Sequence, residues 1–239
     1  MNIAKHRAVM TKILIDIYKD NYLVNKLGFK GGTACYFFHN LPRFSVDLDF
    51  NLLKSNSVDD MELEVLITRL TDILQKYGKI EQSPTKRNTL FWLLNYEKEQ
   101  WNLKVEISTR DFGDEFELKE LLGVSMPVMK KEYIFAHKLV ALTDRKNPVG
   151  RDVFDINFFV KEDWKFVGRI IKERTGMEVE NYLESLPDFV TKHFTSKNIL
   201  DGVGELLDKS KRDHYKVKLL DEVITNLQVL SANYEGYTV

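Results

Sequence analysis

The amino-acid sequence predicts an α+β protein, in which a mixed sheet flanked by helices is followed by an all-helical C-terminal domain. Three observations support this prediction. Apolar residues recur at helical spacing in 3–27 and 63–77. Short β-prone runs occupy much of 79–108, which predicts a sheet. Strand signals then almost disappear, so we expect two domains, 1–126 and 127–239.

The N-terminal elements are expected in the order helix, helix, strand. Residues 3–27 carry one apolar face and precede Gly28, which predicts a single long helix with a glycine stop. The glycine turn Gly31–Thr33 precedes the apolar segment 34–38, which we expect to be helical. Apolar and polar residues then alternate over 45–51, as is typical of a strand.

A second long helix and a meander should complete the first domain. The helix is expected to start near Ser57, where hydroxyl and acidic residues favour an N-terminus, and to end before Gly78. Three β-prone runs follow at 79–85, 89–96 and 102–108. Their short separations predict an antiparallel meander.

The second domain is predicted to be helical throughout. Helical patterns start at Lys130 and continue after a loop at 147–150. The final helix is expected over 219–230.

Composition excludes several classes of protein. The 239 residues are 44% hydrophobic and 30% charged, as in packed globular proteins rather than disordered or fibrous ones. The net charge of −1 gives no global basic field, so any nucleic-acid contact must come from a local cluster of Lys and Arg. No segment approaches the ~20 apolar residues of a membrane span, which predicts a cytoplasmic protein without membrane attachment.

Cysteine and histidine patterns argue against zinc and disulfides. Cys35 is the single cysteine, which excludes an internal disulfide and a CxxC knuckle. The five histidines show neither HxH nor HExxH spacing, so we expect no zinc site.

Asp47 and Asp49 form the first candidate site. Residues two apart on a strand point to the same face, so both carboxylates can meet one ion. Two carboxylates this close repel each other unless a cation lies between them, and Mg²⁺ is the natural candidate. A solvated strand face is the alternative interpretation.

The glycine turn before these acids is a candidate phosphate cradle. Gly31 and Gly32 permit close backbone approach, and Thr33 opens a predicted helix whose N–H groups favour anions. An ordinary tight turn is the alternative. Glu106 lies on a run that can pair beside the Asp47 strand and offers a third carboxylate, or else a salt-bridged surface glutamate.

Charged residues of the second domain form another candidate group. Lys138 and Arg145 are seven apart, so a helix would project both from one face, where they can grip a triphosphate or form local salt bridges. Asp152 and Asp155 follow at a spacing of three on the next helix. The structural alternatives are a helix cap by Asp152 and an Arg151–Asp155 pair.

In order along the chain, four motifs resemble the AbiEii/AbiGii toxin nucleotidyltransferase family. They are Gly28-Phe29-Lys30-Gly31-Gly32-Thr33-Ala34, Arg43-Phe44-Ser45-Val46-Asp47-Leu48-Asp49, Lys138-Leu139 with Ala141 and Arg145, and Arg151-Asp152-Val153-Phe154-Asp155-Ile156. The resemblance spans about residues 25–160. It implies a DNA polymerase β-like nucleotidyltransferase core, followed by a helical domain. Thr33 replaces the serine of the wider superfamily, and the interval to Asp47 is longer than usual.

The resemblance also implies roles for individual residues. The glycine turn would hold the NTP phosphates, and Asp47 and Asp49, with Glu106 as the third acid, would hold one or two Mg²⁺ ions. Arg145 would contact the nucleotide. Further roles fall to four residues of the second domain. Lys138 and Arg151 would contact the nucleotide, and Lys138 would also be catalytic. Asp152 or Asp155 would position a reacting group.

The function expected from these features is Mg²⁺-dependent transfer of an NMP from an NTP to an RNA acceptor hydroxyl, with tRNA as a candidate acceptor. The family implies a toxin with a cognate antitoxin. Two alternatives stay open: transfer to a small molecule such as an aminoglycoside, and an NTP- or RNA-binding module without turnover.

Overall fold

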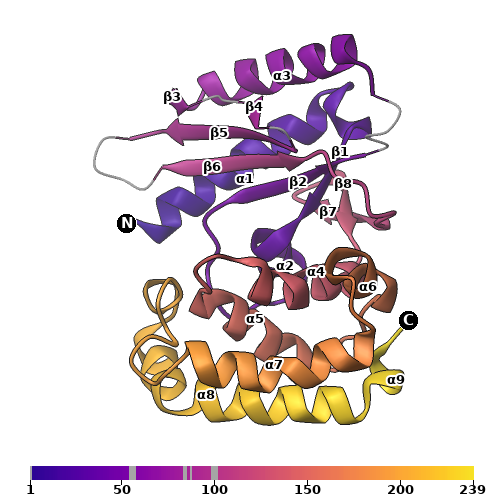
Figure 1. Ribbon diagram of the computed structural model, residues 1–239. Coiled ribbons are helices and arrows are strands. Elements are labelled where there is room, and N and C mark those ends of the chain that lie inside the picture. Colours follow the sequence, from indigo (N-terminus) through magenta and orange to yellow (C-terminus); the bar gives the residue numbers. More distant parts are fainter. Residues whose placement is uncertain (1, 54–57, 83–84, 87, 98–101) are drawn as a thin grey trace. The chain divides into compact units, whose positions relative to one another are not determined.

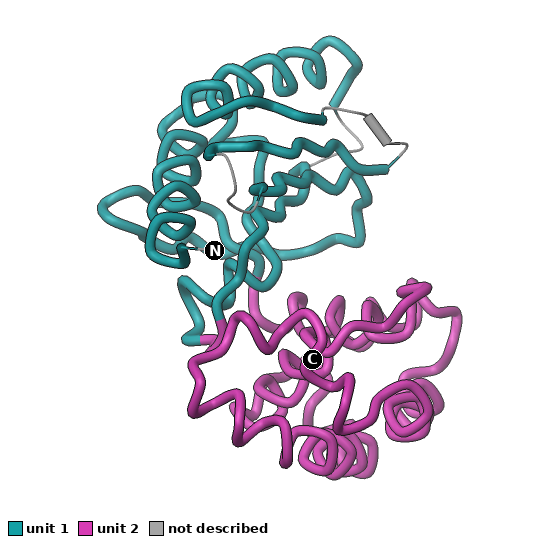
Figure 2. The backbone as a smooth tube through the Cα atoms, turned by 90° about the vertical axis from the view of Figure 1, so that its left-hand side faces the viewer, with its two compact units in different colours: residues 1–40, 44–129 teal, residues 41–43, 130–239 magenta. Residues whose placement is uncertain are grey.

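The chain divides into two compact units (Figure 2). The computed structural model describes residues 2–53, 58–82, 85–86, 88–97 and 102–239. Unit 1 comprises Met1–Asn40 and Phe44–Met129, and unit 2 comprises Leu41–Arg43 and Lys130–Val239. A short segment between two elements of unit 1 therefore belongs to unit 2.

Unit 1 is built on one mixed sheet with the order β3-β5-β6-β2-β1-β8-β7, and β4 pairs with β5 (Figure 1). Its strands are β1 (Leu27–Lys30), β2 (Leu48–Leu52), β3 (Lys79–Gln82), β4 (Thr85–Lys86), β5 (Thr89–Asn95), β6 (Leu103–Ser108), β7 (Phe116–Leu121) and β8 (Val124–Met129). The pairs β1–β8 and β2–β6 are parallel, and the other pairs are antiparallel. The predicted mixed sheet and the β3-β5-β6 meander are confirmed.

Two long helices cover one face of this sheet, α1 (Ile3–Lys19) and α3 (Asp60–Gln75). Tyr18 of α1 packs against Phe50 of β2, with ring centroids 6.3 Å apart. On α3, Thr71 accepts a 3.0 Å hydrogen bond from the indole of Trp92 on β5. Every second residue of β5 and β6 is buried on this face, so Lys104 and Glu106 of β6 lie on the opposite face.

The first helix is shorter than the sequence predicts. It ends at Lys19, and the Asp20 carboxylate accepts the N–H groups of Tyr22 and Leu23 at 2.9 and 3.0 Å. Such a side-chain-to-backbone turn competes with helix continuation. Leu23 and Leu27, which were expected in this helix, lie instead in the 3₁₀ helix η1 (Leu23–Asn25) and in β1. Gly28, expected to end the helix, is a residue of β1.

The other helices predicted for unit 1 are present. Helix α2 (Gly31–Phe38) begins at the glycine turn. Helix α3 has Asp59 as its N-cap, and the Asp59 carboxylate accepts the N–H of Glu62 at 2.8 Å. Ser57, where this helix was expected to start, lies outside the described residues. Strand β2 begins at Leu48, later than its predicted start.

The hairpin of β7 and β8 was not predicted. Its strands are joined by Leu122 and Gly123, which both have positive φ, 50° and 80°. Turns of this type usually carry Asn-Gly or Asp-Gly, and leucine at the first position conceals the signal. The expected domain boundary at 126/127 falls inside β8, and the compact unit continues to Met129.

The described part of unit 2 is helical, as predicted, apart from one isolated bridge between Phe166 and Thr238. Its elements are α4 (Lys131–Asp144), α5 (Gly150–Lys161), α6 (Gly168–Thr175), α7 (Val179–His193), η3 (Gly204–Leu206), α8 (Lys209–Ala232) and α9 (Tyr234–Tyr237). Helix α8 packs beside α5 and α7 (Figure 1). Over the described residues, every helix is too short or too polar to cross a membrane.

Candidate functional site

Asp49 and Glu106 lie side by side on the sheet face opposite α1 and α3. Strands β2 and β6 are parallel neighbours, and their register pairs Asp49 with Glu106. Leu48 and Phe50 are buried on the core face, so Asp49 points to the other face. Asp47 lies directly before β2. The prediction that the Glu106 run pairs beside this acidic strand is confirmed.

The glycine turn meets the acidic strand in space. Gly31 has φ +79°, and a Cβ built on it would lie 2.6 Å from Oδ2 of Asp49. Glycine is therefore required both by the backbone conformation and by the closeness of the carboxylate. Helix α2 starts at this residue, so its N-terminal N–H groups, which favour anions, begin beside the Asp49 carboxylate.

Two buried side chains hold the segment that leads into β2. Thr33 is fully buried, and its hydroxyl donates to the backbone carbonyl of Asp47. His6 is also fully buried; Nε2 lies 3.0 Å from the carbonyl of Val46, and Nδ1 lies 2.7 Å from the hydroxyl of Tyr96. A ring nitrogen facing a carbonyl must donate, so Nδ1 accepts from Tyr96 in the neutral imidazole. Burial lowers the pKa of His6, although the hydrogen bond to Val46 opposes this.

Gly31→Ala tests the contact between the glycine turn and Asp49. The substitution combines left-handed backbone strain of about 1–2 kcal/mol with a steric clash against the carboxylate. Gly123→Ala is a matched control, because Gly123 has φ +80° and nothing within 4 Å of the added Cβ. We expect Gly31→Ala to lower the melting temperature further than Gly123→Ala in thermal unfolding. Equal losses would show that Asp49 does not constrain this position.

The oxygen ligands of this region fit a hard divalent cation. Among the residues that the structure describes, no three or more His, Cys, Asp or Glu side chains are positioned to hold a metal ion. Mg²⁺ does not require such a cluster, because it commonly binds one or two carboxylates and completes its shell with water and substrate phosphates. Asp47 and Asp49, with Glu106 in register, offer that donor set.

Unit 2 contains a buried cluster of charges, formed by Asp152 and Asp155 with Arg43, Lys138 and Arg145. Both carboxylates are fully buried. Asp152 accepts from Nζ of Lys138 at 2.8 Å and from Nε of Arg145 at 2.5 Å. Asp155 accepts two hydrogen bonds from Arg43, at 2.6 and 2.7 Å, and lies 3.1 Å from Nζ of Lys138. The four sequence-predicted residues of this cluster therefore meet.

These contacts determine the charge states of the cluster. Burial by itself would raise the pKa of Asp152, but Lys138 and Arg145 outweigh it and lower the value to about 2. Burial would likewise lower the pKa of Lys138, and the two aspartates reverse this and raise it. Asp152 and Lys138 are thus both ionised at neutral pH. Arg145 keeps its side chain 40% exposed, whereas that of Lys138 is 14% exposed.

The contacts of Asp152 differ from those of a helix cap. Asp152 lies in the first turn of α5, but the N-cap of this helix is Val149. The Asp152 carboxylate binds Lys138 of α4 and Arg145, the C-cap residue of α4, instead of capping α5. Arg151 lies half-buried in the same turn. Arg43 is a residue whose role the sequence reasoning missed, although it stands at the start of the Arg43–Asp49 motif. Its distance from Asp155 along the chain concealed the pair.

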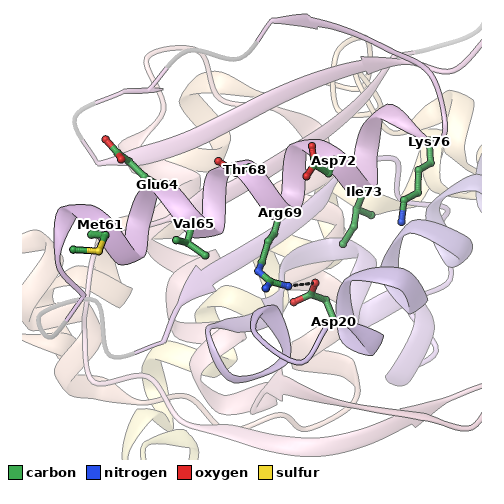
Figure 3. A pocket seen from close by; sticks show the side chains of 9 residues that line it. All are labelled: Asp20, Met61, Glu64, Val65, Thr68, Arg69, Asp72, Ile73 and Lys76. Atoms are coloured by element: carbon green, nitrogen blue, oxygen red, sulfur yellow. Dashed lines mark hydrogen bonds and ion pairs between the residues drawn. The ribbon is translucent and has the colours of Figure 1, made fainter.

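A separate groove runs along the outer side of α3 (Figure 3). It has a volume of about 550 Å³ and is lined by apolar residues such as Met61 and Val65 together with charged ones. Arg69 points toward Asp20, with the two side chains 3.0 Å apart. The groove includes none of the residues predicted for catalysis, so we do not assign the reaction to it.

Comparison with solved structures agrees with the fold. Two solved structures from Helicobacter pylori are similar over nearly the whole chain. One protein, assigned as a nucleotidyltransferase, is 21% identical with a TM-score of 0.60, covering 97% of this chain and 96% of its own. The other, JHP933, is 23% identical with a TM-score of 0.58, covering 98% and 95%. At these identities the similarity establishes the fold.

The family assignment comes from a separate comparison. Among curated protein sequences, none matches the chain. The family model described as nucleotidyl transferase AbiEii toxin, type IV toxin–antitoxin system, matches residues 13–225 and so includes every predicted site residue. The chain therefore belongs to the AbiEii family of nucleotidyltransferase toxins.

Proposed function

We propose that this nucleotidyltransferase moves an NMP from an NTP to a hydroxyl of an RNA acceptor, and that tRNA is that acceptor. One observation carries the proposal: the glycine turn at Gly31 lies against the carboxylate of Asp49, beside Glu106 on the neighbouring strand. Anion-binding N–H groups and cation-binding carboxylates thus come together at one end of β1. A triphosphate with its counter-ion needs both kinds of group.

The first unit supplies the phosphate and metal ligands in this proposal. The N-terminal N–H groups of α2, from Gly31 and Gly32 onward, bind the β and γ phosphates. The hydroxyl of Thr33 is engaged by the Asp47 carbonyl, so Thr33 contributes by fixing the acidic segment and through its backbone N–H. Asp47 and Asp49 would hold Mg²⁺, as the one or two carboxylates that this ion commonly takes from a protein. A role for Glu106 as the third acid stays a prediction from the resemblance. When bound, Mg²⁺ would supply Lewis-acid stabilisation of the phosphate charge.

The reaction itself is a displacement at phosphorus. The acceptor oxygen forms a bond to the α-phosphorus, the bond to the bridging oxygen of pyrophosphate breaks, and the hydroxyl proton passes to a carboxylate or to water. Such a reaction depends on positioning and electrostatics and needs no covalent nucleophile on the protein. A site of carboxylates and backbone N–H groups meets this requirement.

The roles expected for unit 2 stay predictions from the resemblance. Arg145 keeps an exposed guanidinium while Asp152 fixes its Nε, which supports a contact with the nucleotide. Lys138 is bonded to both aspartates, which supports a positioning role for its amino group. Nucleotide contact by Arg151 and positioning of a reacting group by Asp152 or Asp155 likewise stay predictions.

Membership of the family indicates that the protein acts as a toxin. AbiEii proteins are the toxins of type IV toxin–antitoxin systems, and the family implies an antitoxin partner. We infer that toxicity results from blocking an RNA hydroxyl that translation needs.

The direct test is label transfer. Purified protein is incubated with Mg²⁺, each α-labelled NTP in turn, and total tRNA. We expect label in tRNA with one or two of the four nucleotides, and loss of transfer when EDTA removes the metal. Label that appears instead in an added aminoglycoside would identify a small-molecule acceptor. NTP binding without release of pyrophosphate under any condition would contradict the enzymatic proposal.

A further inference from the structure

The first half of α8 is an unusually basic segment in a chain whose net charge is −1. We call residues 209–218 the basic arm. Its ten positions include five Lys or Arg residues and a single acid, Asp213; the cations are Lys209, Lys211, Arg212, Lys216 and Lys218. Such a local excess of positive charge is the electrostatic signature of a surface that binds a polyanion.

These cations do not contribute to the core of unit 2. All residues of the basic arm are exposed except Tyr215, which is half-buried. The buried residues of α8 begin only at Leu219 and continue through Val223, Leu227 and Leu230. The arm therefore has no packing requirement for its charged residues.

Acidic neighbours neutralise little of the positive charge. Lys211 lies 3.8 Å from the Asp208 carboxylate at the helix N-cap. Among the residues that the structure describes, Lys209, Arg212, Lys216 and Lys218 make no ion pair. Four cations are thus available to an external anion.

A hollow between α5 and α8 adjoins the arm. It has a volume of about 460 Å³ and is lined by His214 and Lys218 of the arm together with Lys161 and Thr225. Two acids also line it. Of these, Glu222 is neutralised by Lys161 at 2.6 Å and receives a 3.2 Å hydrogen bond from Asn157, while Asp221 remains as a negative group.

The pattern of exposed residues distinguishes between possible polyanions. An interfacial membrane helix needs a continuous apolar face, and a protein partner usually needs apolar or aromatic anchors. Val217 is the strongly exposed aliphatic residue of the arm, at 70%, and it stands among cations. Cations on several sides of a helix match phosphates spaced along a nucleic-acid backbone, where phosphate contacts supply most of the affinity.

We infer that the basic arm binds the sugar–phosphate backbone of the RNA acceptor, with the adjoining hollow receiving one phosphate beside Lys218. The choice of RNA rests on the proposed function. The surface itself rests on the charge and exposure of α8. Contacts of this kind hold an acceptor without reading its sequence.

The test compares two full-length variants that each lose four positive charges. The arm variant is Lys209→Gln/Arg212→Gln/Lys216→Gln/Lys218→Gln, in which glutamine keeps a helix propensity close to that of lysine. The control variant is Lys12→Gln/Lys19→Gln/Lys76→Gln/Lys79→Gln, which alters four exposed lysines of unit 1. Circular dichroism confirms that both variants fold. Binding of total tRNA is measured between 50 and 200 mM salt, without NTP.

We expect the arm variant to bind tRNA about tenfold more weakly at 100 mM salt, with the slope of log affinity against log salt reduced by about 3. The control variant should match the wild type. Equal binding by both variants, or no tRNA binding by the wild type, would overturn the inference. Competition by polyglutamate as effective as competition by tRNA would also overturn it, because the surface would then suit an acidic protein.

The assay separates this inference from the proposed function. If the arm variant loses tRNA binding while the wild type transfers no label to any RNA, the surface stands and the proposed reaction fails. If transfer to tRNA occurs and the arm variant binds and reacts normally, the reaction stands and the surface fails.

Discussion

Asp49→Asn is expected to lower the rate of NMP transfer by at least about 10²–10³, the loss typical when one preorganised electrostatic group is removed from an active site. Asparagine keeps the size of the side chain beside Gly31 but removes the charge that would hold Mg²⁺. The rate is measured with α-labelled NTP and the acceptor found in the label-transfer assay. Asp47→Asn/Asp49→Asn should be inactive.

The matched control is Asp72→Asn, which makes the same chemical change at an exposed position on α3. It should transfer NMP at the wild-type rate. Thermal unfolding of the three variants, compared with the wild type, shows whether a loss of rate reflects a loss of fold. A folded Asp49→Asn protein with full activity would contradict the assignment of the metal site.

Arg43→Met is expected to lower the free energy of unfolding by about 3 kcal/mol, near the lower end of the range for breaking a buried ion pair. Asp155 is fully buried, and Arg43, whose side chain is 3% exposed, donates two hydrogen bonds to it. The loss should not reach the upper end, because Lys138 remains 3.1 Å from the same carboxylate. Urea unfolding measures the difference.

Arg69→Met provides the comparison, since Arg69 also pairs with an aspartate but has a side chain 48% exposed. A surface ion pair contributes about 0–1 kcal/mol, so this variant should unfold close to the wild type. Arg43→Lys keeps the charge but loses the two-pronged geometry, and its stability should fall between the wild type and Arg43→Met. Equal stability of the Arg43→Met and Arg69→Met proteins would show that the buried pair does not stabilise unit 2.

Local patterns predicted most of the fold. Helices α3, α4 and α5 follow local patterns because each helix satisfies its own backbone hydrogen bonds. The meander strands do so through neighbours that are close in sequence. The predicted end of the first helix was wrong because Leu23 and Leu27 continue its apolar spacing. The Asp20 turn and the pairing of β1 with β2 determine the backbone conformation of these residues instead. Leu122 in a left-handed turn concealed the β7–β8 hairpin.

The candidate site was predictable as a set of residues but not as a geometry. The motifs indicated Asp49 and the glycine turn, and the β-prone run beside the acidic strand indicated Glu106. The structure adds that a Gly31 Cβ would contact Asp49. Sequence spacing also indicated that Lys138 and Arg145 share a helix face, yet not that both bind Asp152. These contacts depend on register and on distant segments, which no local pattern encodes.

The inclusion of residues 41–43 in unit 2 has an evolutionary consequence. The chain passes from unit 1 to unit 2 at 40/41, returns at 43/44 and passes again at 129/130. A gene fragment that begins at Lys130 encodes every helix of unit 2 but omits Arg43, the partner of the buried Asp155. The C-terminal half is therefore not a cassette that recombination can exchange alone, and residues 43 and 155 are expected to change together in lineages of this family.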